Sequence, residues 1–122
     1  MTLRSLLLAG LLALALAGCV QAASAAPERR VVVVVDAAAG PAALADARAA
    51  VARSGGEATL RVPRTATEQL SVTHYFAAQG YEFIVGIGLD ERVAVTPVTR
   101  KFPDTQFVAA QPGHVAPVLA RR

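Results

Sequence analysis

The chain of 122 residues has a single cysteine, Cys19, and no tryptophan, and only 5% of its residues are aromatic. One cysteine cannot form a disulfide within the chain, which excludes a disulfide-stapled scaffold. The scarcity of aromatic rings argues against a carbohydrate-binding surface built on ring stacking. The length that remains after any leader permits one small domain.

Charged residues are few and mixed, with 12 basic and 9 acidic side chains and a formal net charge of +3. The basic residues are scattered among acidic ones, so we expect no nucleic-acid-binding stripe. The sequence has no nucleophile elbow, phosphate-cradling loop or paired-carboxylate motif. His74 has no second metal ligand three or four residues away, and His114 has no acidic neighbour. We therefore expect no catalytic residues, no metal and no cofactor.

The N-terminus combines Arg4 with an apolar run of Leu and Ala over residues 6–17. This run is too short to cross a hydrocarbon core of about 30 Å as a helix, and its layout is typical of a processing segment. The segment resembles a bacterial lipoprotein signal whose lipobox is formed by Leu16, Ala17, Gly18 and Cys19. The alternative is a general secretory signal, cut within the alanine-rich residues 22–26, with an incidental cysteine.

The resemblance to a lipoprotein signal implies cleavage before Cys19 and acylation of its sulfur. Two or three acyl chains hold a protein firmly on a membrane, whereas one holds it weakly. We therefore expect a signal peptide at residues 1–18, a lipid-anchored tether at 19–29 and a single domain at 30–122. The membrane is then a partner through the acyl chains, and the domain faces the periplasm or the exterior at the cell envelope.

The expected domain alternates strand and helix patterns. Five consecutive valines at residues 31–35 are typical of a strand buried on both faces. Similar reasoning predicts further strands at residues 58–62, 83–88 and 106–110, and a short fifth strand at 115–119. Helices are expected over residues 41–53, from a cap at Thr65 or Thr67 to about residue 79, and from Asp90 to about residue 102, with a restart at Thr96 and Pro97.

This alternation predicts an α/β fold, a three-layer sandwich in which a parallel sheet is covered by helices on both faces. Right-handed crossovers leave few possible topologies, and the common strand order is 2-1-3-4-5. In such sheets ligands bind at the carboxyl ends of the strands. Asp36 ends the valine strand, and Gly86 and Gly88 end the third strand, so these residues are candidate ligand contacts, together with Asp90.

Each candidate also has a structural interpretation. Asp36 could instead cap the next helix, and Asp90 fits a helix cap better than a ligand contact. Gly86 and Gly88 could serve a tight strand-to-helix turn, because a lone Gly-x-Gly is a weak signal.

Two segments, residues 79–88 (QGYEFIVGIG) and 101–108 (KFPDTQFV), resemble the basic membrane protein family in register, spacing and order. These are nucleoside-binding lipoproteins that serve ABC importers. The resemblance extends over about residues 30–120 and corresponds to the N-terminal lobe of a two-lobed type I periplasmic-binding fold. It implies a nucleoside-like ligand, an ABC permease as partner, and Asp36 as the ligand residue that carries over.

We therefore expect a membrane-anchored lipoprotein that binds a small polar, nucleoside-like ligand and catalyses no reaction. A second lobe on another chain, or a second copy of this one, would complete the site. The alternative is an extracytoplasmic interaction module, or a degenerate fragment that has lost ligand binding.

Overall fold

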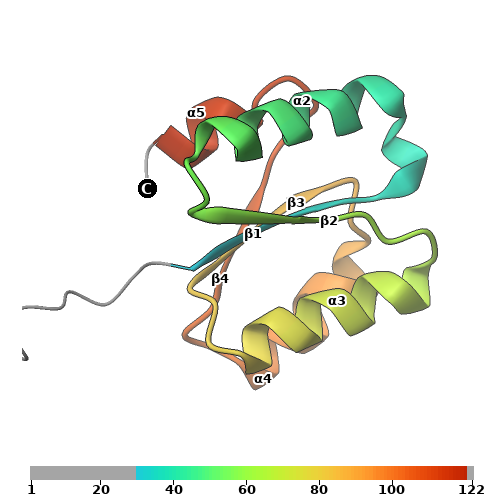
Figure 1. Cartoon of the computed structure of the whole chain (residues 1–122). Coiled ribbons are helices and arrows are strands. Elements are labelled where there is room, and N and C mark those ends of the chain that lie inside the picture. Colours follow the sequence, from blue (N-terminus) through green and yellow to red (C-terminus); the bar gives the residue numbers. More distant parts are fainter. Residues whose placement is uncertain (1–29, 121–122) are drawn as a thin grey trace, which may run out of the picture.

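The computed structural model of the chain describes residues 30–120 (Figure 1). Its strands are β1 (Val31–Val35), β2 (Ala58–Arg61), β3 (Phe83–Ile87) and β4 (Gln106–Ala109). Its helices are α2 (Pro41–Arg53), α3 (Ala66–Ala78), α4 (Thr96–Lys101) and α5 (Val115–Ala120), with a short 3-10 helix η1 (Ala37–Ala39) and a π-helical turn η2 (Glu91–Val95). The predicted signal peptide, Cys19 and the tether lie outside the described residues.

The strands form one parallel sheet in the order β2-β1-β3-β4. Helices α2 and α5 cover one face of this sheet, and α3 and α4 cover the other (Figure 1). The predicted α/β class, with a parallel sheet between helices, is therefore confirmed.

The valine strand β1 lies in the interior of the sheet and is buried on both faces. Val32 to Val35 are 0% exposed and Val31 is 6% exposed. The odd-numbered valines pack with Ala47 and Ala50 of α2, whereas the even-numbered ones pack with Phe76 of α3. An unbroken apolar run is what a strand with a helix layer on each side requires.

Two helix starts follow the predicted caps. Thr65 Oγ1 accepts a hydrogen bond from the backbone N–H of Glu68 at 3.1 Å, at the start of α3. Asp90 caps η2, and α4 then begins at Thr96 with Pro97 in its first turn. Proline is tolerated there because a first-turn N–H has no partner within the helix. The predicted restart at Thr96 and Pro97 is thus confirmed.

The predicted fifth strand at residues 115–119 is wrong, because Val115–Ala120 forms the helix α5. Its buried and half-buried apolar residues fall at helical spacing and complete the layer that α2 begins; they are Val115, Ala116, Val118 and Leu119. Pro117 occupies the first turn, where its missing N–H removes no helical bond. The order 2-1-3-4-5 therefore lacks its fifth strand within residues 30–120, and β2 and β4 form the two edges.

Among residues 30–120, no helix has the length and apolar character needed to cross a bilayer.

Candidate functional site

The carboxyl ends of β1 and β3 lie side by side, since the two strands are paired along their length. The chain leaves β1 toward α2 on one face of the sheet and leaves β3 toward α4 on the other (Figure 1). Open α/β sheets bind ligands where neighbouring strand ends diverge in this way, and we call this place, between the ends of β1 and β3, the crevice. Asp36 follows β1 directly and Gly88 follows β3 directly, so the structure brings these two predicted residues together at the crevice.

The contact between Asp36 and Gly88 is close. The Asp36 N–H donates to the carbonyl of Ile87 at 2.9 Å. A Cβ atom placed on Gly88 would lie 3.4 Å from the Cβ of Asp36 and 3.6 Å from that of Ala39. Gly88 has a φ of 71°, a backbone conformation that favours glycine. The turn after β3 therefore depends on glycine at this position, which packs against Asp36 and Ala39.

Asp36 is half-buried as a residue, but its carboxylate oxygens reach solvent and have no partner among residues 30–120. Asp36 stands at the N-cap position of η1, yet its side chain makes no capping hydrogen bond. No hydrogen bond or ion pair joins this carboxylate to any residue between 30 and 120. The capping role that the sequence allowed for Asp36 is therefore not what the structure shows, and the carboxylate is free to accept hydrogen bonds from a ligand.

Gly86 serves packing inside the sheet. Its carbonyl accepts a hydrogen bond from the Ala110 N–H at 2.9 Å. A Cβ atom placed on Gly86 would lie 2.7 Å from Cδ1 of Leu89. The missing side chain makes room for Leu89, so the structural interpretation fits Gly86 better than ligand contact does.

Asp90 is occupied as a helix cap. Its Oδ1 accepts hydrogen bonds from the N–H groups of Arg92 at 3.0 Å and Val93 at 3.2 Å. Its own N–H donates to Oε1 of Gln69, a residue of α3 that is only 6% exposed. These bonds fix the start of η2 and leave Asp90 a structural role.

Sequence reasoning missed two residues that shape the crevice. The Ala37 N–H donates to the carbonyl of Pro63 at 2.9 Å, which ties the loop after β1 to the end of β2. Ala39 adds the methyl group that faces Gly88. Pro63 directly follows the predicted strand at 58–62, and Ala39 lies in the loop after the predicted strand at 31–35, so their positions near strand ends were the signal that could have identified them.

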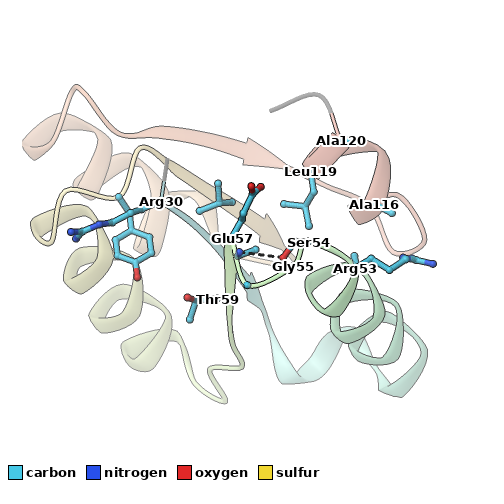
Figure 2. A pocket seen from close by; sticks show the side chains of 14 residues that line it. Arg30, Arg53, Ser54, Gly55, Glu57, Thr59, Ala116, Leu119 and Ala120 are labelled. Atoms are coloured by element: carbon cyan, nitrogen blue, oxygen red, sulfur yellow. Dashed lines mark hydrogen bonds between the residues drawn. The ribbon is translucent and has the colours of Figure 1, made fainter. Parts of the chain in front are cut away.

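A broad hollow of about 970 Å³ lies at the opposite, amino edge of the sheet, where the sequence predicted no site (Figure 2). Arg30 and Arg53 lie at opposite ends of this hollow and do not point toward each other (Figure 2). The Arg30 guanidinium donates to the Gln79 carbonyl at 3.2 Å and lies over the ring of Tyr81. The charged groups of the hollow therefore do not converge on one ligand.

Within the described part of the chain, no cluster of three or more His, Cys, Asp or Glu is arranged to hold a metal ion. His74 Nε2 lies 3.3 Å from Nζ of Lys101, and its ring meets Phe102 edge-on at 5.2 Å between centroids. His114 lies in the turn before α5, with Nδ1 3.4 Å from the Pro112 carbonyl. Each histidine thus has a local structural contact.

The crevice at Asp36 and Gly88 is the candidate site that sequence and structure share. No protein-family model matches the chain, and neither a curated protein nor a solved structure was found to be similar to it.

Proposed function

We propose that this protein is a membrane-anchored lipoprotein whose α/β domain binds a small polar, nucleoside-like ligand without catalysis. The observation that carries the proposal is the solvent-accessible carboxylate of Asp36, which has no partner among residues 30–120 and lies where the ends of β1 and β3 meet. The carboxylate oxygens reach solvent, since no buried side-chain oxygen among the described residues lacks a hydrogen bond, so a ligand can approach them.

The chemistry of Asp36 restricts the ligand. An ionised carboxylate accepts hydrogen bonds and donates none, so the ligand must present donors. The neighbouring hydroxyls of a ribose fit this requirement, because each could donate to one carboxylate oxygen in a charge-assisted bond. The side chains of η1 beside Asp36 are all alanine, so none of them adds a polar group or a large side chain next to the carboxylate.

A ligand at the strand ends of a lone domain is contacted from the side of the sheet only, so the domain encloses only part of it. Small-molecule sites usually bury most of the ligand surface. A second surface would complete the enclosure, supplied by a permease, by a second lobe on another chain or by a second copy. We expect modest affinity for the isolated chain and higher affinity in the assembly.

The described domain begins at the edge of the sheet opposite the candidate site. Arg30 precedes β1 at the amino edge, whereas Asp36 follows β1 at the carboxyl edge. A tether over residues 19–29 would therefore join the domain at the edge opposite Asp36.

The test is calorimetric titration of the full chain in mild detergent with a panel of nucleosides and purine bases. Asp36→Asn keeps the shape of the side chain and removes its charge, so we expect at least about tenfold weaker binding of the best ligand. Asp104→Asn is the matched control, because Asp104 is exposed in the turn before β4, at the opposite edge. Absence of binding across the panel, or an equal loss in both variants, would contradict the proposal.

A further inference from the structure

The outer edge of β4 carries unused backbone hydrogen-bonding groups. The N–H groups of Gln106 and Ala110 donate toward β3, to the carbonyls of Glu82 at 2.8 Å and Gly86 at 2.9 Å. Strand hydrogen bonds alternate in direction, so the N–H and C=O of Phe107 and Ala109 point away from the sheet. No strand within residues 30–120 pairs with this edge, because β4 is the last strand in the sheet order.

The two edges of the sheet differ in how well they resist further pairing. The other edge strand, β2, ends in Arg61 and is followed closely by Pro63. A charged residue and a proline are common devices that keep edge strands from adding another strand. The sequence of β4 is Gln-Phe-Val-Ala, which contains no charge, proline or glycine. The β4 edge is therefore the one that remains open to pairing.

A hollow of about 540 Å³ runs beside this edge, between β4 and the helical segment formed by η2 and α4. Glu91 and Arg100 both line it and are exposed, and no ion pair joins them. Glu91 begins η2, just beyond the carboxyl edge of the sheet, whereas Arg100 lies near the end of α4, just before the chain returns to start β4. The hollow thus carries a negative charge near one end of β4 and a positive charge near the other.

We propose that two copies of this chain associate by antiparallel pairing of their β4 strands, which extends the sheet across both copies. A two-fold axis through this contact brings Glu91 of each copy toward Arg100 of the other. If Val108 lies opposite Val108 of the second copy, Phe107 pairs with Ala109 of that copy. Every outward-pointing backbone N–H and C=O group of β4 then forms a hydrogen bond. This dimer goes beyond the ligand site and does not depend on it.

The charge arrangement favours a second copy over an unrelated peptide. An unrelated strand would satisfy the same backbone groups but has no reason to carry a positive charge at one end and a negative charge at the other. Parallel pairing of two copies would place the α3 and α4 face of one beside the α2 and α5 face of the other. Glu91 and Arg100 would then not meet, so the antiparallel arrangement is the self-complementary one.

Cysteine cross-linking tests the contact. In the full chain with Cys19→Ser, Val108→Cys supplies the only thiol, and facing residues of antiparallel strands lie about 4.5–5.5 Å apart at Cα. That separation lies within the range of a disulfide. We expect a cross-linked dimer under mild oxidation. Thr59→Cys on β2 is the matched control, since it is also a half-buried residue of an edge strand, and it should form no cross-link because the β2 edges do not meet in the dimer. Equal cross-linking of both variants, or none at Val108→Cys, would overturn the proposal.

A charge exchange tests the two-fold arrangement by sedimentation over a range of concentrations. Arg100→Glu should weaken association by about tenfold, because each Glu91 then faces a like charge across the axis. Adding Glu91→Arg should restore association, since the exchanged charges attract again. A chain that is monomeric at all concentrations, or a double variant no better than Arg100→Glu alone, would overturn the proposal.

Discussion

Leu89 lies directly over Gly86, so that a Cβ atom at position 86 would sit 2.7 Å from Cδ1 and 3.1 Å from Cγ of the leucine. Glycine inside a strand loses conformational freedom and provides no packing. Here its absence of a side chain lets Leu89 pack against the core on the α3 and α4 face, beside Ile84 and Val98. Leu89, which follows the turn at Gly88, thus completes the hydrophobic core beneath the candidate site.

Gly86→Ala should lower the free energy of unfolding by about 1–3 kcal/mol, the usual cost of overfilling a core. Urea unfolding at low protein concentration measures this. Leu89→Ala removes the obstructing atoms, so Gly86→Ala introduced into a Leu89→Ala chain should cost far less. An equal loss in both backgrounds would show that Leu89 is not the cause.

Thr73 joins α3 to the π-helical turn. Its hydroxyl is fully buried and lies 2.9 Å from the Ala94 carbonyl and 3.0 Å from that of Gln69. Thr73→Val keeps the volume but leaves these carbonyls without that donor, so we expect a loss of about 1–3 kcal/mol. Thr99→Val is the control, because the Thr99 hydroxyl makes only an exposed bond to the Val95 carbonyl. Urea unfolding should separate the two, and equal losses would contradict this role for Thr73.

The start of α3 depends on a reciprocal pair of caps. Thr65 accepts from the Glu68 N–H, and Oε2 of Glu68 accepts from the Arg64 N–H at 2.7 Å. Thr65→Ala should destabilise the chain by about 1 kcal/mol, whereas Thr65→Ser should be nearly neutral because it keeps the acceptor oxygen. Chemical denaturation of both variants tests this, and an unaffected Thr65→Ala chain would contradict it.

The membrane anchor can be tested apart from the fold. If Cys19 is the acylated residue, Cys19→Ser should abolish incorporation of labelled fatty acid in a bacterial host that processes lipoproteins. Ser24→Ala, within the predicted tether, is the control and should leave incorporation unchanged. Unaltered labelling of Cys19→Ser would favour the general secretory signal.

The alternation of elements was predictable because each signal was local. The valine run marked a buried strand, and Thr65, Asp90 and Pro97 marked helix starts, which depend on nearby side chains. The segment Val115–Ala120 misled because five or six apolar residues fit a strand or a helix equally well. This segment forms a helix because the sheet face beside α2 would otherwise be uncovered, and that need is visible only in the assembled fold.

The faces of helices and the state of the site were less predictable. In α2 the fully buried residues are Ala43, Ala47 and Ala50, which are small enough for the helix to lie close to the sheet. For the site, a position at a strand end was enough to identify Asp36 and Gly88. That the carboxylate of Asp36 has no partner depends on contacts between distant segments, which the sequence alone does not specify.

The burial of β1 has a consequence for the unfolded chain. Its partners β2 and β3 are formed much later in the sequence, by Ala58–Arg61 and Phe83–Ile87. A chain that is still being made, or that has lost either neighbour, exposes five consecutive valines. Such uncharged windows of high β-propensity stack readily into cross-β fibrils. Refolding of this protein should therefore be limited by aggregation through Val31–Val35, in competition with the closing of the sheet around it.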